Sequence, residues 1–269
     1  MKNIKFITGL ILILGSYFLF LYDFGEIKVT GNDPIIQLVE EVLTVSVSDD
    51  ETILLKNIVA SDLEDGDLTN KIVVDSISKF DENKERTVTY VVFDSDDNMT
   101  KAKRKIKYSD YEAPMIDLEK PLVFYYVGNN NEFKNFLGAT SKLDGDLSSK
   151  IVIDRRYCIV NQCYIDVSVM DSTGTKTEQT FKTDELNIIP NVIFELTDYL
   201  LYVPVGTEIN PWSYIKKIES MGINLTYQTD RIEIQNNYNS SKPGMYEFIY
   251  RYTGSAGDYG IAKLVIIVE

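Results

Sequence analysis

Beyond residue 33, hydrophobic and polar residues alternate in short runs instead of recurring with a helical period. These runs, such as "LTVSVS", "TVTYVVFD" and "YEFIYRY", are rich in β-branched and aromatic residues, and Gly, Asn, Asp, Ser and Pro separate them. Short strands divided by turn residues are typical of β-sandwiches. The pattern therefore predicts an all-β fold. One segment differs: in "NPWSYIKKIES", Asn210 and Pro211 predict the start of a short helix over residues 210–220.

The N-terminal segment has another pattern, because residues 6–22 carry no charge. As a helix they would extend about 26 Å, enough to cross the hydrocarbon core of a bilayer. Lys2 and Lys5 precede this run and Asp23 and Glu26 follow it, so the positive-inside rule places the N-terminus in the cytoplasm. No small-residue cleavage site follows. We therefore predict an uncleaved signal anchor in residues 1–24 and an ectodomain outside the cell membrane; a cleaved signal peptide is the alternative.

Internal repetition divides the ectodomain. "DGDLTNKIVVD", which starts at Asp65, returns as "DGDLSSKIVID", which starts at Asp144. "VTYVVFDSDDN" is echoed by "IDVSVMDSTGT" in the same order. The third part has no DGDL stretch, but it keeps a later half, "KPGMYEFIYRY". The repetition predicts three units, at residues 33–110, 111–186 and 187–269.

The motifs "VPVGTEINPWSYI", "DLEDGDLTNKI", "KPGMYEFIYRY" and "FDSDDN…KRKIKY" together resemble the bacterial immunoglobulin-like repeats of group 3. Repeats of this type occur in tandem on surface proteins and in a pesticidal crystal toxin. The resemblance covers residues 33–269 and departs most in unit 2, which has "RRYCIVNQCY" where P-G-x-Y is expected. It implies three tandem Ig-like sandwiches behind one transmembrane helix on a bacterial cell surface. For function it implies display, adhesion or spacing, because Ig-like folds carry many unrelated roles.

Composition narrows the function classes. The chain has a net charge of −14, and its part beyond the anchor carries 25 basic and 41 acidic residues, a net charge of −16. Such an acidic ectodomain argues against nucleic acid or an anionic membrane surface as a partner. The sequence has no histidine, which removes the commonest general base and zinc ligand. We predict a protein that is not an enzyme.

The acidic stretch "ASDLEDGDLTNKI" admits two interpretations. Asp-Gly is a strong turn dipeptide, and only Asp-Gly-Asp-Leu is kept in the second copy, so we favour a turn. The alternative is calcium, the only cofactor the sequence suggests. The stretch does not fit an EF-hand, but loops from separate strands meet at one end of a sandwich and gather carboxylates there. The residues of this calcium alternative are Asp62, Glu64, Asp65, Asp67, Asp94 and Asp96.

The two cysteines, Cys158 and Cys163, lie between strand-like flanks in "RRYCIVNQCYIDV". In an oxidising exterior they predict a structural disulfide that closes a hairpin; two free thiols are the alternative.

Together these features predict a membrane-anchored cell-surface protein with a binding, adhesion or spacer ectodomain. Its ligand would be an extracellular protein or glycan. Two alternatives stay open: a sensory or regulatory ectodomain of a membrane complex, and an extracellular carbohydrate-binding accessory.

Overall fold

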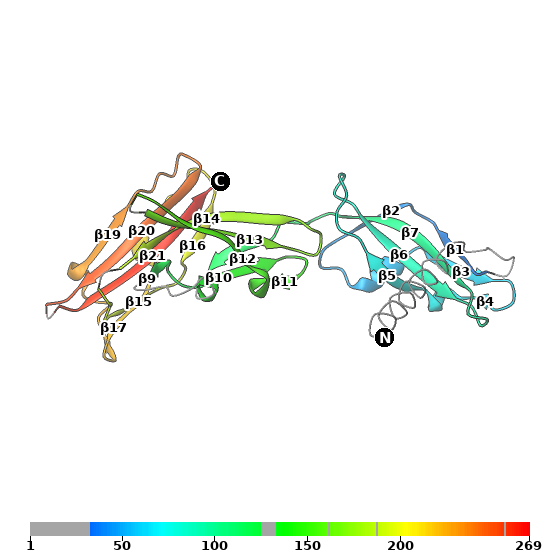
Figure 1. Cartoon of the computed structure of the whole chain (residues 1–269), viewed down its shortest axis with the longest axis horizontal. Coiled ribbons are helices and arrows are strands. Elements are labelled where there is room, and N and C mark those ends of the chain that lie inside the picture. Colours follow the sequence, from blue (N-terminus) through cyan, green and yellow to red (C-terminus); the bar gives the residue numbers. More distant parts are fainter. Residues whose placement is uncertain (1–32, 125–132, 161, 187, 256) are drawn as a thin grey trace, which may run out of the picture. The chain divides into compact units, whose positions relative to one another are not determined.

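The computed structural model describes residues 33–124, 133–160, 162–186, 188–255 and 257–269 (Figure 1). The predicted anchor over residues 6–22 lies outside these ranges, and within them no helix is long and apolar enough to cross a membrane. The described chain is all-β, as expected, with strands joined by short 3₁₀ helices. It divides into two compact units, one formed mainly by residues up to Lys107 and the other mainly by Tyr108–Glu269. Each is described by itself.

The first unit is a sandwich of a three-stranded and a four-stranded sheet, called here the first sandwich. In the four-stranded sheet, alternate side chains of the central strand Arg86–Phe93 point into the core, so that Val88, Tyr90 and Val92 are buried. The smaller sheet has the order β1 (Ile35–Leu38), β3 (Ile58–Asp62), β4 (Gly66–Asp67). The larger has the order β2 (Val42–Val45), β7 (Met99–Tyr108), β6 (Arg86–Phe93), β5 (Val73–Ile77). Two 3₁₀ helices join strands, η1 (Glu51–Leu55) and η2 (Thr69–Lys71).

The second unit repeats this architecture twice. In the second sandwich, β9 (Val123–Phe124) pairs in parallel with β14 (Lys176–Glu185) and thereby completes the larger sheet. The smaller sheet has the order β11 (Gly145–Asp146), β10 (Leu137–Ser141), β8 (Met115–Leu118). The larger has the order β12 (Val152–Ile159), β13 (Gln162–Met170), β14 (Lys176–Glu185), β9 (Val123–Phe124). Its 3₁₀ helices are η3 (Lys134–Phe136) and η4 (Ser148–Lys150).

The third sandwich has the same two-sheet plan, with β16 (Leu200–Val203) parallel to β21 (Tyr259–Val268). The smaller sheet has the order β15 (Ile193–Leu196), β17 (Ile215–Ser220), β18 (Ile223–Asn224). The larger has the order β16 (Leu200–Val203), β21 (Tyr259–Val268), β20 (Gly244–Thr253), β19 (Ile232–Asn236). Its 3₁₀ helices are η5 (Pro211–Tyr214) and η6 (Thr229–Arg231). The strands of the three sandwiches run over residues 35–108, 115–185 and 193–268, within the three predicted units.

The helix predicted over residues 210–220 is wrong beyond its first turn. Asn210 does cap a helical turn, since its side chain accepts a hydrogen bond from the backbone N–H of Trp212. The turn ends at Tyr214, and Ile215–Ser220 forms β17, which pairs with β15. The spacing of Ile215 and Ile218 favours a helix, but the segment pairs with β15 through a register shift beside Ile215, so the available strand partner decided the outcome.

The second and third sandwiches share hydrophobic packing. Leu264 and Ile266 of β21 point into the core of the third sandwich, while Val265, between them, is buried in the core of the second. Leu200 of β16 joins Val265 there, and the Tyr202 hydroxyl donates to the carbonyl of Ile116 at 2.8 Å. Both faces of β21 are therefore covered. This explains why "LVIIV" is continuously apolar and does not alternate.

Candidate functional site

The Asp-Gly dipeptides form tight turns, as the sequence predicts. Gly66 has a φ of +76° and Gly145 a φ of +73°, a conformation that glycine adopts without strain. In the first sandwich an Asp62 carboxylate oxygen accepts from the N–H groups of Glu64 and Asp65 at 2.7 and 3.0 Å. These bonds hold the pKa of Asp62 below its ordinary value, the one from Asp65 contributing most.

In the second sandwich a serine accepts the corresponding hydrogen bonds of the turn. The Ser141 hydroxyl accepts from the N–H groups of Leu143 and Asp144, each at 3.2 Å. Since a neutral hydroxyl replaces the carboxylate of Asp62 at the same place, the turn requires an acceptor and no charge.

A second carboxylate of each turn connects the two sheets. Asp65 accepts from the backbone N–H of Ser95 at 2.6 Å and from its hydroxyl at 2.8 Å. Asp144 accepts from the same two groups of Ser172 at 2.6 and 2.7 Å. We call this pair of bonds the turn–loop staple, because it joins the turn of the smaller sheet to a loop between two strands of the larger sheet.

The last aspartate of each DGDL motif starts the following 3₁₀ helix. Asp67 accepts from the N–H of Thr69, and Asp146 from the N–H of Ser148, both at 2.9 Å. The Thr69 hydroxyl and N–H hold the pKa of Asp67 below its ordinary value. The leucine that follows this aspartate, Leu68 or Leu147, is buried in both copies and packs the turn against the core.

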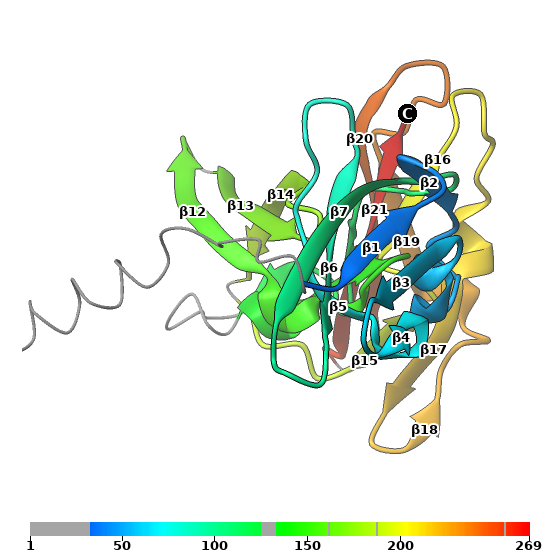
Figure 2. The same ribbon diagram turned by 90° about the vertical axis from the view of Figure 1, so that its right-hand side faces the viewer.

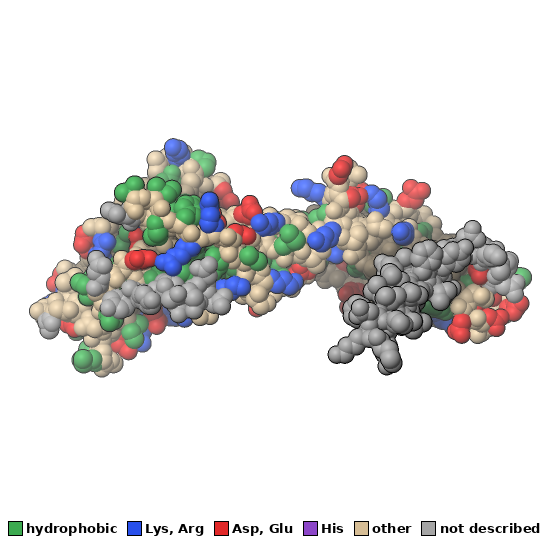
Figure 3. All heavy atoms as spheres, viewed as in Figure 1, with side chains coloured by type: hydrophobic (Ala, Val, Ile, Leu, Met, Phe, Trp, Pro, Cys, Tyr) green, Lys and Arg blue, Asp and Glu red, His purple; other side chains and the backbone are tan. Residues whose placement is uncertain are grey.

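The remaining residues of the calcium alternative lie in the loop after β6. The Asp94 carboxylate is buried and accepts from the N–H groups of Asp96 and Asn98 and from the Asn98 side-chain amide. The structure thus gathers the predicted residues at one end of the first sandwich, where acidic side chains cluster beside β4 (Figure 3). Across the described ranges, no group of three or more Asp, Glu, Cys or His side chains is arranged to hold a metal ion. Calcium binding stays a prediction.

The third sandwich has the same element in a form that the sequence comparison missed. Asn224 accepts from the N–H of Thr226 at 2.8 Å, and the Thr226 hydroxyl accepts from the N–H of Ile218 at 2.9 Å. Thr69 and Ala60 make the latter contact in the first sandwich. The signal was the triplet Asn-Leu-Thr at residues 224–226, which parallels Asp-Leu-Thr at 67–69. The preceding turn differs, because Met221 and Gly222 form it.

A disulfide joins Cys158 and Cys163 across the end of the β12–β13 hairpin, where the two residues face each other in the register. The rings of Tyr157 and Tyr164, the next pair along the hairpin, stack with their centroids 5.5 Å apart. The bridge therefore closes a hairpin, as the spacing suggests.

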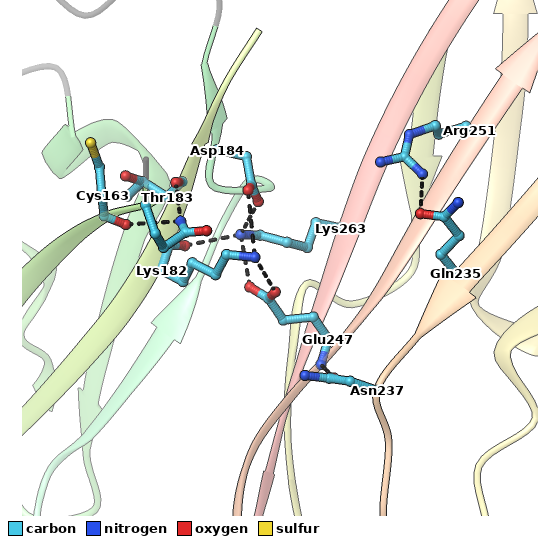
Figure 4. A network of polar contacts seen from close by, with 10 residues as sticks. Cys163, Lys182, Thr183, Asp184, Gln235, Asn237, Glu247, Arg251 and Lys263 are labelled. Carbon is cyan, nitrogen blue, oxygen red and sulfur yellow. Dashed lines mark hydrogen bonds and ion pairs between the residues drawn. The ribbon is translucent and has the colours of Figure 1, made fainter. Parts of the chain in front are cut away.

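A buried lysine lies where the second and third sandwiches pack together. Lys263 of β21 is fully buried, and its ammonium group donates to three oxygens, the number it can serve (Figure 4). These are a carboxylate oxygen of Asp184 at 2.7 Å, one of Glu247 at 3.0 Å and the carbonyl of Lys182 at 2.9 Å. Glu247 also accepts from the Lys182 ammonium at 3.1 Å. We call these four residues the Lys263 network.

The charges of the Lys263 network balance, since two lysines meet two carboxylates. Burial disfavours the charged form of Lys182, but the carboxylates of Glu247 and Asp184 outweigh this and raise its pKa. Sequence reasoning did not single out these residues, because Asp184 and Lys263 are far apart in the chain. The network can lock the two sandwiches in one register, because an ammonium group leaves water only where its partners are placed.

An acidic hollow lies beside this junction. Its volume is about 620 Å³. The hollow is lined by Asp117, Glu119, Glu195 and Asp198 together with Lys120 and Lys216. Burial raises the pKa of Asp117, and the nearby Asp198 charge adds to the effect.

Comparisons with known proteins give distant likenesses. No family model and no curated protein matches the chain. Among solved structures, the lipoprotein BT2262 from Bacteroides thetaiotaomicron is 17% identical over 29% of this chain and 37% of its own, with a TM-score of 0.24. The CBM51-2 and INT domains of Clostridium perfringens ZmpB, in complex with GlcNAc, are 17% identical over 56% of this chain and 42% of theirs, with a TM-score of 0.23.

The human Desmocollin-1 ectodomain is 12% identical over 88% of this chain and 61% of its own, with a TM-score of 0.19. This chain spans less than half the length of the two bacterial chains. At such TM-scores these likenesses carry no conclusion about what the protein does.

Proposed function

We propose that the protein is a non-enzymatic, membrane-anchored cell-surface protein. Its tandem sandwiches, of the bacterial Ig-like type, would bind an extracellular protein or glycan. Residues 6–22 would anchor the chain, and the sandwiches would lie outside the cell. The acidic composition and the lack of histidine support this proposal.

The observation that carries the proposal is the single body formed by residues 108–269. Shared packing around Val265 and the Lys263 network fix two sandwiches to each other, so the loop ends of both are held in fixed positions. A binding site assembled on such a body loses little conformational entropy on contact with a partner. A protein that works as a flexible tether would have no use for a buried ion network between neighbouring sandwiches.

A binding assay on the full chain tests the function. Beads that carry the purified chain should retain an extracellular protein, or a glycan on an array, in a saturable way. The competing interpretation is a regulatory ectodomain, which needs a partner that spans the membrane. If a stoichiometric membrane protein co-purifies in detergent and no extracellular ligand binds, the proposal is wrong.

The anchor has its own test. The intact protein should begin at or near Met1 and stay with membranes in high salt. An N-terminus between residues 23 and 30 would show that the segment is a cleaved signal peptide.

A further inference from the structure

The end of the third sandwich that corresponds to the Asp-Gly turns is built differently from its two counterparts. In the first and second sandwiches the turn–loop staple joins Asp65 to Ser95 and Asp144 to Ser172. In the third, the β17–β18 turn is Met221-Gly222, and the facing loop between β20 and β21 begins at Gly254. Among the residues that the structure describes there, no hydrogen bond joins turn and loop.

A cavity of about 290 Å³ lies where the staple would close the end. Met221, Ile223 and Leu225 line one side of it, and Arg231 and Asp258 are among the polar residues of its lining. The β17–β18 hairpin projects from the sandwich (Figure 2). We call these five residues the third-sandwich end surface. Two sandwiches thus close this position with the staple, and among the described residues the third has a cavity there.

Met221 is not a residue type that is preferred at its position in the turn. It is 97% exposed and has a φ of +47°, followed by Gly222 at +81°. Two-residue hairpin turns with positive φ at both positions favour Asn-Gly or Asp-Gly, and an unbranched apolar side chain gains nothing there from folding. Ile223, two residues on, is 62% exposed. Such departures from local rules are expected at functional sites.

Arg231 supplies a charge that has no partner among the described residues. It is half-buried, and its guanidinium group makes no hydrogen bond or ion pair within the described part of the chain. By contrast, Arg251 of the same sandwich donates to the side chain of Gln235 at 2.6 Å. Asp258, a carboxylate of the same lining, accepts from the Asn191 side-chain amide at 3.4 Å.

We infer that the third-sandwich end surface docks a protein segment that presents an apolar side chain next to a carboxylate. An exposed methionine adapts to an apolar side chain, and methionine and arginine are both enriched where protein interfaces form. Arg231 would take the carboxylate in a paired, charge-assisted bond. This inference rests on the proposed binding function and assigns it a surface and a partner chemistry.

Methyl NMR of the full chain, with ¹³C-labelled methionine methyl groups, tests the surface directly. The probe is a capped peptide with leucine next to aspartate. We expect it to shift the Met221 methyl resonance and to leave those of Met115 and Met170, which are 46% and 42% exposed, in place. A peptide with lysine for the aspartate, or alanine for the leucine, should shift the Met221 resonance much less.

Variants separate the charge from general effects. Arg231→Gln should weaken the probe's binding about tenfold, the loss of one charge-assisted bond. Arg251→Gln, which removes the same charge from the same sandwich, should leave binding unchanged. Met221→Asn suits the positive φ of the turn, so it should fold and lose the probe.

Any one of the following NMR or binding results would overturn the inference: no shift at Met221, equal shifts at Met115 and Met170, equal shifts with the lysine peptide, or Arg231→Gln binding as well as the wild type. A Met221 shift that depends on the concentration of the chain alone would assign the surface to a second copy and also overturn it. In the bead assay, equal ligand retention by wild type and Met221→Asn would overturn the surface and leave the proposed function standing. If the bead assay finds no ligand, that result contradicts the proposed binding function alone. The docking surface is tested separately by the NMR titration.

Discussion

The first sandwich and the pair formed by the second and third each bury a cation, but in opposite ways. Arg104 lies inside the core of the first sandwich. Among the described residues it donates to neutral oxygens, namely the carbonyls of Leu54 and Lys56 and the hydroxyl of Tyr90. Lys263 lies between two sandwiches and meets two carboxylates. A guanidinium group spreads its charge over a plane and tolerates neutral acceptors, whereas a compact ammonium group needs opposite charge when water is removed.

The outer faces of the corresponding last strands show the same contrast. In β7 of the first sandwich, Lys101, Lys103 and Lys107 alternate with core residues and are exposed. In β21 of the third sandwich, the residues at alternate positions are Lys263, Val265 and Ile267, and the second sandwich covers them. A lysine on an exposed strand costs nothing in desolvation, while the same residue on a covered strand must bring its own counter-charges. The comparison yields five predictions.

Breaking the Lys263 network should have the largest effect. Lys263→Ala leaves the buried Glu247 and the partly buried Asp184 with one lysine between them, so we expect the unit of residues 108–269 to lose about 3–5 kcal/mol of unfolding free energy. Denaturant unfolding of the full chain measures it. Lys103→Ala, on the exposed face of β7, is the matched control and should change stability by less than about 0.5 kcal/mol. A loss below 1 kcal/mol for Lys263→Ala would show that the network is not a lock.

Removing the other buried cation should cost less. Arg104→Met strands neutral acceptors and no carboxylate, so the first sandwich should lose about 1–3 kcal/mol. The Tyr90 hydroxyl still donates to the Leu54 carbonyl at 2.7 Å, which limits the loss. The comparison fails if Arg104→Met proves more damaging than Lys263→Ala in the same unfolding experiment.

The Asp-Gly turns should respond alike in both regions, because their geometry is the same. Gly66→Val and Gly145→Val place a β-branched residue at positive φ, which costs about 1–2 kcal/mol each. A Cβ at either position meets no atom within 4 Å, so the cost is backbone strain and not a clash. Gly66→Asn, which tolerates this φ, is the control. Equal melting temperatures for Gly66→Val and Gly66→Asn would contradict the strain argument.

Tyr202 should make the second unit sensitive to alkaline pH. Burial, with the charges of Asp117 and Glu269 adding to it, raises the pKa of its phenol from 10.0 to about 12. A raised pKa means that folding favours the protonated phenol. Its stabilisation is therefore complete below pH 10 and is lost as the pH rises toward 12.

Tyr202→Phe should lose about 1 kcal/mol at neutral pH with the bond to the Ile116 carbonyl. Its unfolding free energy should then fall less steeply than that of the wild type between pH 10 and 12. Parallel pH profiles of the two proteins would show that Tyr202 does not titrate in this way.

The smallest effect concerns the acidic turn. Asp62→Asn with Glu64→Gln keeps the acceptor oxygen of the turn, so the first sandwich should change by less than about 0.5 kcal/mol. Calcium binding predicts otherwise: millimolar calcium would raise the melting temperature of the first sandwich, and the double variant would abolish the rise. Thermal scans with calcium and with chelator decide between them. The second sandwich, with Ser141 and Leu143 at these positions, is the internal control.

Much of the fold could be predicted from local sequence patterns. Period-2 alternation predicted the strands, and the repeated Asp-Gly turns predicted the repetition of the sandwich plan, because glycine at positive φ is a local requirement. Sequence spacing failed at residues 215–220, where strand pairing overrode a helical pattern. It also failed at Asn224, where the motif keeps its hydrogen bonds with a different residue type. At residues 215–220 the strand partner β15 lies outside the local window, whereas at Asn224 the bond from Thr226 is local and the motif was missed because asparagine replaces aspartate.

What the sequence determined alone is therefore the list of local elements: the turns, the strands, the hairpin with its cysteines and the acidic character of the chain. The tertiary structure alone decided which faces are covered. "LVIIV" is only an apolar run until the second sandwich packs on it, and Lys263 is only a lysine in a strand until Asp184 and Glu247 meet it. Burial and ion pairing depend on contacts between residues far apart in the chain, and local sequence patterns do not reveal such contacts.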